Sequence, residues 1–538
     1  MARVAAQLTN FTAGELSPRL DGRNDLSKYP AGCKTLENIV IYPHGAAARR
    51  PGTQFISEVK TSSAKTRLIP FEFSTTQTYV LEFGNQYMRV YKDKGRVETS
   101  PGTAFEISTP YLTAELFDIK FAQSADVMYL THPSHPTKKL SRTGHTAWTL
   151  TTVDFTNGPY LDTNTSATTM QPSGTTGSVT VTASTNVFTS DDVGRSIRIK
   201  NGSDWGFAKI TGYNSATNVN ATVNADRPFS ATSANVDWRL GSFYVGNYPT
   251  KITFFEERLF YAGTTQQPST VFSSMSADFD KFSPTAKNGD VADDNALQFT
   301  IVSDQVNQIT GLYGGKFLAI FTKNGAFNMS SGSATSGLTP TTLQVTNETN
   351  DGAADKRVSP ASKSVLFIGK NKKRLREFAY NIDYDSFTTP DMTVLSEHVG
   401  FGGFEECCFA NYPNNILWVR RGDGVLLGFT YYRDQDVTAW HRHTIAGTNA
   451  KVKSITVIPG IDDAFDTLYM IVERTINGAV KQYVEFSRLG DNKSDVKTTD
   501  FPFLTILPVA LTKTSGTHGF KNLTSRSSVK GSSLPSDK

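Results

Sequence analysis

Two histidine pairs are the first places in this chain where metal chemistry could occur. His441 and His443 stand two residues apart on an expected strand, so both side chains would point to one face, and His132 and His135 flank a Pro-Ser turn. A metal site needs a third ligand at a recognisable spacing, and the sequence offers none beside either pair. We therefore expect no metal and interpret these histidines as solvent-facing or turn residues.

Adjacent carboxylates are the next candidates, because glycoside hydrolysis needs two of them flanking one sugar bond. Neighbours on a strand point to opposite faces, so such pairs are better interpreted as a charged rim; they are Glu256–Glu257, Asp293–Asp294 and Glu405–Glu406. The segment SRTGHTAW (141–148) is similar to the turn of sialidase blades but lacks its aspartate.

Nucleophile and phosphate motifs give no better candidate. No G-x-S-x-G or Walker A pattern occurs. Cys407 and Cys408 are adjacent on an expected strand, which favours ordinary burial over redox chemistry. We expect no catalytic residue, no cofactor and no enzymatic activity.

Three basic clusters could contact nucleic acid: Arg49–Arg50, Arg420–Arg421 and KNKKRLRE (370–377). They would have to converge on one face to bind phosphates, and lysines at a hairpin tip more often serve as a solvated surface. The formal net charge is only +4, with 54 basic and 50 acidic residues. This balance argues against a surface that embraces nucleic acid as a whole.

Length and composition set the class of protein. A chain of 538 residues exceeds one ordinary domain, and 41 glycines with 35 phenylalanines and 20 tyrosines suit many short strands joined by tight turns. Three cysteines are too few for a disulfide framework, which suits a reducing cytosol. The start of the chain lacks the pattern of a signal peptide, and no apolar run approaches the roughly 20 residues that span a bilayer. We expect a soluble protein.

Strand patterns are the elements that must position any site. Apolar, β-branched and aromatic runs on either side of a short polar or glycine turn predict hairpins. They lie at 78–93, 118–133, 251–264, 316–330, 364–380, 415–431 and 466–486. Outside one insertion they recur at roughly 40–50 residues, the spacing of propeller blades with about four strands each.

Three internal similarities support repetition. LSRTGHTAWTLTT (140–152) matches YRDQDVTAWHRHT (432–444), ADFDKFSP (277–284) matches IDYDSFTTP (382–390), and ERLFYAG (257–263) loosely matches KRLREFAY (373–380). We predict an all-β chain whose β-propeller-like body has about six or seven blades, together with an irregular amino-terminal arm and a small inserted β-sandwich or barrel.

The expected boundaries follow from composition. The arm covers 1–60, the first blades 61–160, and the remaining blades 246–490. Between them, 161–245 is rich in threonine and serine and alternates strictly, as in a small half-exposed antiparallel sheet; we expect it to face outward. The last segment, 491–538, predicts one strand, FPFLTILPVAL (501–511), followed by a flexible polar tail.

The arm carries a family resemblance. NFTAGELSPRLDGRNDLSKYPAGCKTLENIVIYPHGAAARRPGTQFI (10–56) resembles the amino-terminal signature of the nozzle proteins of short-tailed bacteriophages, also called tail tubular protein B. The pattern F-x-x-G-E-x-S-P-x-L-x-G-R-x-D is followed by Y-x-x-G-C-x-x-L-x-N and by P-x-G-x-x-x-R-R-P-G-T-x-F. Segments 254–283, 293–301, 321–329 and 380–399 are similar to the family in the same order, whereas 161–245 has no counterpart.

The resemblance implies a structural virion protein of the short tail, assembled in the bacterial cytoplasm. Such subunits form a ring, typically a hexamer, below an adaptor ring, sometimes beside tail fibres and with its far end toward the host envelope. The ring retains packaged double-stranded DNA and lets it pass without reading its sequence. A near-neutral surface suits such a conduit, since many phosphate contacts would hold the duplex.

Two other classes remain as alternatives. A host-glycan-binding or glycan-cleaving propeller spike would need a carboxylate pair or an aromatic platform in one pocket. An adaptor or head-completion protein would be smaller and more helical than this strand-rich chain.

The candidate site residues lie in the arm. We predict that Arg19, Arg23, Asp25, Arg49 and Arg50 hold contacts between subunits or brace the arm on its own propeller, because arginine–carboxylate pairs fix register. The alternative is that Gly, Pro and Arg merely build turns around a local core formed by Leu20, Leu26, Tyr29, Leu36 and Ile39.

Overall fold

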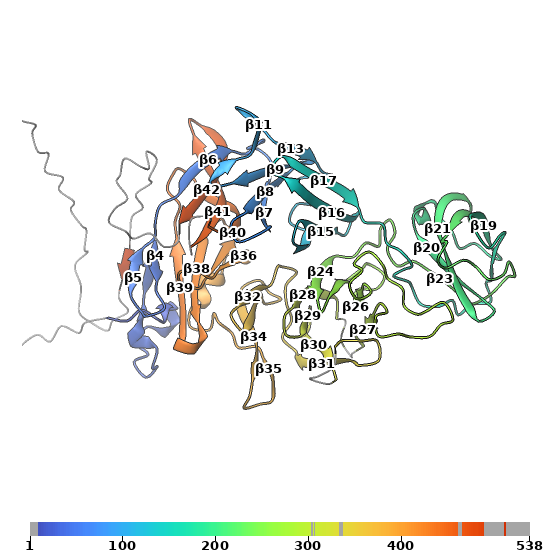
Figure 1. Cartoon of the computed structure of the whole chain (residues 1–538). Coiled ribbons are helices and arrows are strands. Elements are labelled where there is room, and N and C mark those ends of the chain that lie inside the picture. The colour runs from blue at the N-terminus through green and yellow to red at the C-terminus, as the bar shows by residue number, and fades with distance from the viewer. Residues whose placement is uncertain are drawn as a thin grey trace, which may run out of the picture.

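The computed structural model describes residues 9–302, 305, 307–332, 337–460, 465–488 and 510–512. Strands dominate this part of the chain, and its helices are five short 3-10 segments. Within it, no helix has the length and hydropathy of a membrane span. Seven sheets each contain a four-stranded antiparallel meander and surround a common centre (Figure 1). The body is therefore a seven-bladed β-propeller, which confirms the predicted fold class.

The first four blades run from residue 67 to residue 349, interrupted by the insertion. Blade 1 contains β7 (Arg67–Glu72), β8 (Thr78–Gly84), β9 (Tyr87–Lys92) and β10 (Gly95–Arg96), with β13 (Glu106–Ser108) also paired to β9. Blade 2 contains β14 (Lys120–Ser124), β15 (Val127–His132), β16 (His135–Gly144) and β17 (Ala147–Thr152). Blade 3 contains β24 (Lys251–Phe255), β25 (Arg258–Ala262), β26 (Thr270–Ser273) and β27 (Gln298–Thr300). Blade 4 contains β28 (Ile309–Gly314), β29 (Leu318–Thr322), β30 (Ala326–Ser331) and β31 (Leu343–Thr349).

The last three blades follow without a further insertion. Blade 5 contains β32 (Ser359–Ala361), β33 (Ser364–Ile368), β34 (Leu375–Asn381) and β35 (Ser386–Thr388). Blade 6 contains β36 (Phe404–Ala410), β37 (Ile416–Arg421), β38 (Leu426–Tyr432) and β39 (Val437–His443). Blade 7 contains β40 (Lys451–Pro459), β41 (Asp466–Ile476), β42 (Ala479–Arg488) and β6 (Gln54–Glu58). Each of the seven predicted hairpins is present.

One hydrophobic cluster fills each interface between neighbouring blades. Between blades 7 and 1, for example, Leu68 and Val80 pack with Tyr469 and Phe486. Equivalent clusters join blades 1 and 2, 2 and 3, 3 and 4, 4 and 5, 5 and 6, and 6 and 7. A blade of alternating residues has two apolar faces, so each face is buried only if a neighbouring blade covers it.

The circle is closed by the strand β6, which reaches blade 7 from the other end of the chain. It pairs antiparallel with β42, with Ser57 opposite Val484. We assigned residues 54–58 to the arm, and this boundary is wrong. QFISE is short and its side chains are only partly buried, so nothing local distinguishes it from the arm; the exposed edge of β42 selects it.

The insertion is a separate six-stranded antiparallel sheet with its own core. Its strands are β18 (Met170–Pro172), β19 (Ser178–Ala183), β20 (Ser196–Asn201), β21 (Asp204–Ser215), β22 (Asn218–Val223) and β23 (Trp238–Leu240). A bridge between Met170 and Asn235 brings the two edges of the sheet together, which closes it as a small barrel. It projects to one side of the propeller, opposite the arm (Figure 1).

The repeats seen in the sequence fall partly at equivalent places. The Thr-Ala-Trp segments put Trp148 and Trp440 on the fourth strands of blades 2 and 6. Segments 277–284 and 382–390 both follow the third strand of a blade. The third pair of segments is not structurally equivalent, so this prediction of a repeat is wrong. Segment 257–263 contains the second strand of blade 3, whereas 373–380 contains the third strand of blade 5.

The carboxyl-terminal prediction is only partly within the described residues. β43 (Ala510–Thr512) pairs antiparallel with Thr35–Glu37 of the arm. The remainder of the segment 491–538, with most of the predicted strand and the polar tail, lies outside them.

Ring closure can be tested at Val59, which follows β6. Its side chain is buried in the cluster between blades 7 and 1, and its N–H donates to the Gln482 carbonyl over 3.1 Å. Val59→Ala removes two buried methyl groups, at about 0.8 kcal/mol each before any cavity cost. Val59→Pro also removes the N–H, so we expect a clearly lower urea midpoint than for Val59→Ala. Equal midpoints for the two variants would show that this backbone contact does not hold the ring closed.

Candidate functional site

The arm lies along the outer edge of blade 6 (Figure 1). Its short elements are β1 (Gly14–Glu15), η1 (Pro18–Leu20), η2 (Tyr29–Ala31), β2 (Gly32–Cys33), β3 (Thr35–Glu37), β4 (Ile39–Ile41) and β5 (Ala47–Arg49). β3 pairs in parallel with β39 through Glu37 and Arg442. The arm therefore extends the sheet of blade 6 and covers its outer edge.

Gly14 allows the closest approach of the arm to the propeller. Its φ is +65°, and a Cβ at this position would lie 2.4 Å from the Trp440 nitrogen and 2.7 Å from the Ala439 Cα. Both neighbours are backbone atoms of β39, so they have little freedom to move aside. Only glycine meets the conformational and the steric requirement together.

Glu15 is the polar centre of the contact between arm and propeller. Its buried carboxylate accepts hydrogen bonds from the Leu36 N–H at 2.8 Å and from His398 Nε2 at 2.7 Å, and it forms an ion pair with Arg442. Burial by itself would raise the pKa of Glu15, but the bonds from His398, Leu36 and Arg442 outweigh it and hold the pKa below its ordinary value. The Glu15 carbonyl accepts from Ser396 Oγ at 2.6 Å.

A second polar contact joins the end of the arm to the end of β39. Asn38, buried with a φ of +58°, donates from Nδ2 to Thr444 Oγ1 at 2.8 Å and accepts the Thr444 N–H at 3.0 Å. Arg50 is also buried and donates to the carbonyls of Pro51 and Thr444. Burial lowers the pKa of Arg50 to about 10, opposed by the charge of Glu485.

The other predicted site residues are distributed along the outside of the arm. Arg19 forms an ion pair of 2.9 Å with Glu397 of the same chain, although its side chain is 78% exposed. Arg23 and Asp25 pair with each other in bidentate geometry, at 2.8 and 2.7 Å, on the surface. Arg49 is exposed on β5. The structure thus brings Arg50 into the arm contact and leaves Arg23, Asp25 and Arg49 at the surface.

The predicted local core of the arm divides into two parts. Leu20, Leu26 and Tyr29 pack together with Leu395, which precedes blade 6. Leu36 and Ile39 instead pack on Val437 and Ala439 of β39 and nearby arm residues. Glu15 and Asn38 belong to the amino-terminal motif, but we did not predict them as site residues. A carboxylate and an amide among apolar neighbours could have indicated that both are buried and hydrogen-bonded.

The histidine pair of β39, His441 and His443, lies beneath the arm. The interpretation of this pair as solvent-facing is therefore wrong. His441 and His443 are 0% and 1% exposed on one face of β39, and His441 Nδ1 lies 2.6 Å from His443 Nε2. His441 Nε2 also contacts Thr430 Oγ1, which donates to the Ile41 carbonyl of the arm. Burial lowers the pKa of His441 to about 3, assisted by the charge of Arg50, and holds that of His443 well below its ordinary value.

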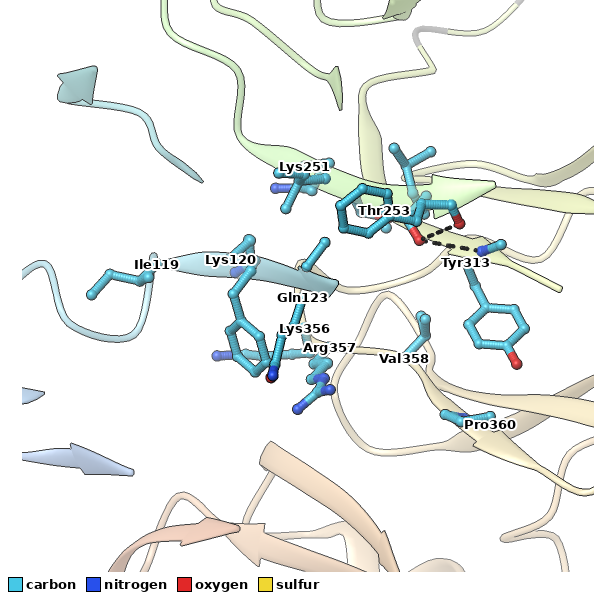
Figure 2. A pocket seen from close by; sticks show the side chains of 18 of the residues that line it. Ile119, Lys120, Gln123, Lys251, Thr253, Tyr313, Lys356, Arg357, Val358 and Pro360 are labelled. Carbon is cyan, nitrogen blue, oxygen red and sulfur yellow. Dashed lines mark hydrogen bonds between the residues drawn. The ribbon is translucent and has the colours of Figure 1, made fainter. Parts of the chain in front are cut away.

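A pocket of about 300 Å³ lies at the centre of the propeller (Figure 2). The first strands of blades 2, 3 and 4 line it, together with Arg67 at the start of blade 1 and the segment that leads into blade 5. Its cationic side chains are Arg67, Lys120, Lys251, Lys356 and Arg357. A smaller adjoining space of about 30 Å³ adds Glu405 and Glu406. These residues are far apart in sequence, and the ring alone brings them together.

Ion pairs neutralise part of this charge. Lys120 and Lys251 both contact Asp355, at 3.1 and 2.9 Å. Lys356 contacts Glu405 at 2.7 Å. The two lysines hold the pKa of Asp355 at about 2 against the effect of burial.

The interpretation of carboxylate pairs as a charged rim is wrong for Glu405 and Glu406. The register of β36 shifts between Phe404 and Glu406, and both acids line the inner pocket although they are neighbours. Glu406 pairs with Arg67 and Arg420, and Glu405 with two lysines. Burial would raise the pKa of Glu405, but Lys356 and Lys372 outweigh it and keep the pKa below its ordinary value. A glycosidase acid needs the opposite shift.

The other histidine pair, His132 and His135, has an acidic residue, Glu115, as its third member. Glu115 Oε2 lies 2.8 Å from His135 Nε2, and ligand atoms of Glu115, His132 and His135 all lie within 4.8 Å of one another. The Ser134 N–H donates to His132 Nδ1 at 3.0 Å, so in the neutral ring Nε2 carries the proton. The protonated Nε2 is then not free to bind a metal, and of the three side chains only Glu115 and His135 share a hydrogen bond.

The predicted basic clusters do not form one surface. Arg420 pairs with the inward-facing Glu406, whereas Arg421 pairs with its neighbour Asp423. In segment 370–377, Lys372, Arg374 and Arg376 each pair with a carboxylate. These charges are used to connect loops and strands of the chain itself.

Comparisons with known proteins identify no relative of this chain by sequence. No protein-family model matches the chain, and no curated protein is significantly similar in sequence. Among solved structures, the Neurospora crassa Pan2 WD40 domain is 9% identical, covers 69% of this chain and 90% of its own, and has a TM-score of 0.31. The Myceliophteria thermophila Cps50 (Swd1) β-propeller domain is 8% identical, covers 70% and 99%, and has a TM-score of 0.34. The order of the strands in its own sheets, and not these weak similarities, defines the protein as a β-propeller.

The arm contact can be tested with a matched pair of glycines. We expect Gly14→Ala to displace the arm from β39, because the new methyl group would overlap backbone atoms. Tryptic cleavage after Arg19 and Arg23 should then become faster while the propeller stays folded. Gly22→Ala is the control, since Gly22 also has positive φ, +84°, but no atom lies within 4 Å of the place its new methyl group would take. Equally fast cleavage of both variants would show that backbone strain, and not overlap with β39, releases the arm.

The buried histidines predict loss of stability in mild acid. Their folded-state pKa values lie below the ordinary 6.5, so below pH 6.5 the unfolded chain binds more protons and the free energy of unfolding falls. Each histidine contributes a slope of about 1.4 kcal/mol per pH unit until its folded pKa is reached.

Denaturant titrations from neutral pH to about pH 4 would measure this slope, with the double variant His441→Gln/His443→Gln as comparison. We expect a flatter curve for the variant. Parallel curves for the wild-type protein and the variant would contradict the assignment of the acid sensitivity to His441 and His443.

Proposed function

We propose that this chain is a structural subunit of the ring-shaped nozzle of a short bacteriophage tail, with no enzymatic activity. The ring, a hexamer, lies below the adaptor ring and beside the tail fibres, with its far end toward the host envelope. It retains packaged double-stranded DNA and conducts it into the host without reading its sequence. Subunits fold in the bacterial cytoplasm and function in the virion.

The observation that carries this proposal is the amino-terminal motif. Its residues in this chain have specific structural tasks that a chance match would not require. Gly14 admits the arm to the backbone of β39, Glu15 holds three donors, and Asn38 and Arg50 attach the arm to Thr444. The motif therefore supports a shared architecture, in which an arm is fixed on a propeller.

A ring subunit also needs surface that a neighbour can bury. The hairpin between β34 and β35 extends from the propeller (Figure 1) and exposes large apolar side chains at its tip. Ile382 is 81% exposed and Tyr384 is 73% exposed. Burying side chains of this size contributes about 1.5–3 kcal/mol each, so this hairpin is our candidate for a contact between subunits.

Electron microscopy of the purified protein and of virions tests the proposal. We expect rings of one subunit type, with DNA density along the ring axis in virions. Ile382→Asp combined with Tyr384→Asp should shift the protein toward monomers in light scattering, because two carboxylates would have to be buried. Val193→Asp, in the inserted domain, is the matched control, with a similarly apolar side chain that is 48% exposed.

A strictly monomeric protein that is absent from purified particles would refute the nozzle proposal. Saturable binding or cleavage of host glycans by the purified protein would instead favour the propeller spike. If rings persist in the double variant and virions are unchanged, the contact between subunits does not involve this hairpin.

A further inference from the structure

The central pocket has more cationic than anionic side chains. Five cations line it, whereas three carboxylates pair with them. These acids are Asp355, Glu405 and Glu406. Nearby, Glu72 and Asp118 add two negative charges, and Arg420 and Lys372 add two positive charges. The pocket therefore keeps a positive field with low-dielectric walls, which concentrates anions.

Arg357 is the one cation among these five pocket side chains that has no ion pair among the described residues, and it is exposed to the pocket. Among the described residues its guanidinium has no ion pair and no side-chain hydrogen bond. It lies over the face of Phe121, 4.3 Å from the ring centroid, and remains open to the pocket. Glu72 and Glu406 act on it electrostatically but lie beyond ion-pair distance. A guanidinium is planar and presents its N–H groups in one plane.

Other donors face the same space. Lys120 and Lys356 line both parts of the pocket, and an ammonium group has three protons, more than their single carboxylate contacts use. Burial, together with the like charge of Lys251, lowers the pKa of Lys120 to about 8 although Asp355 opposes the shift.

We propose that the central pocket binds a small, multiply charged oxyanion, a phosphate or diphosphate, through Arg357, Lys120 and Lys356. The planar guanidinium suits two oxygens of one phosphate group, and the ammonium groups supply point charges. The volume of about 300 Å³ exceeds the roughly 30 Å³ share of a water molecule several times over, so such an anion fits with solvent around it. The proposal is independent of the nozzle function.

Calorimetric titration of the full-length protein with sodium pyrophosphate and with inorganic phosphate, at neutral pH and low salt, tests it. We expect saturable binding and a ligand-dependent rise in Tm. Arg357→Met should weaken pyrophosphate affinity about tenfold or more, as loss of charge-assisted hydrogen bonds requires. Lys370→Met is the control, because it removes one positive charge from an exposed hairpin outside the pocket.

Lys120→Met gives a second variant if Arg357→Met does not fold, as judged by circular dichroism. Absence of saturable binding by the wild-type protein would overturn the proposal. Equal weakening by Lys370→Met and the pocket variants would also overturn it, because it would indicate unspecific charge. Competition by a short DNA duplex at the same phosphate concentration would assign the site to a nucleic-acid backbone, and so would overturn the small-anion assignment.

Discussion

The structure depends on closing a circle of apolar interfaces. Every blade has two faces to bury, and each cluster needs residues from two neighbours, so an open array would leave two faces in water. At the last cluster, between blades 7 and 1, β6 brings the beginning of the chain to β42 and completes blade 7. This single pairing joins residues more than 400 positions apart, and it places the arm residues from 9 to 53 next to blades 6 and 7.

The arm follows from that placement. Its backbone continues the sheet of blade 6, and its carboxylate Glu15 is buried against His398 and Arg442 rather than left in solvent. A buried charge is tolerated only when several donors surround it, so the motif specifies one position of the arm more strictly than apolar packing would. Beneath it, Gly428 leaves room for the ring of His441, whose neutral form the covered site requires. Arm, histidines and β39 thus form one unit.

The same ring geometry creates the central pocket. The first strand of each blade faces the axis, so one or two side chains per strand converge although they come from separate parts of the sequence. Here those side chains are largely lysine and arginine, while the overall charge of the protein is nearly balanced. In our proposals the outer surface serves assembly in a ring, and the axis binds a small anion.

The amino-acid sequence by itself determined the elements. Alternating apolar residues around glycine and polar turns predicted the hairpins, and their spacing predicted the blades. The threonine-rich composition of 161–245 predicted an inserted β-sandwich or barrel, because these are local properties of strands and turns. Tertiary structure decided what depends on distant partners. It made QFISE a blade strand, buried His441 and His443 under the arm, and used a register shift to direct Glu405 and Glu406 into one pocket. It also assembled Arg67, Lys120, Lys251 and Arg357 around an axis. No local pattern encodes these outcomes, since burial and charge pairing are set by which surfaces meet when the circle closes.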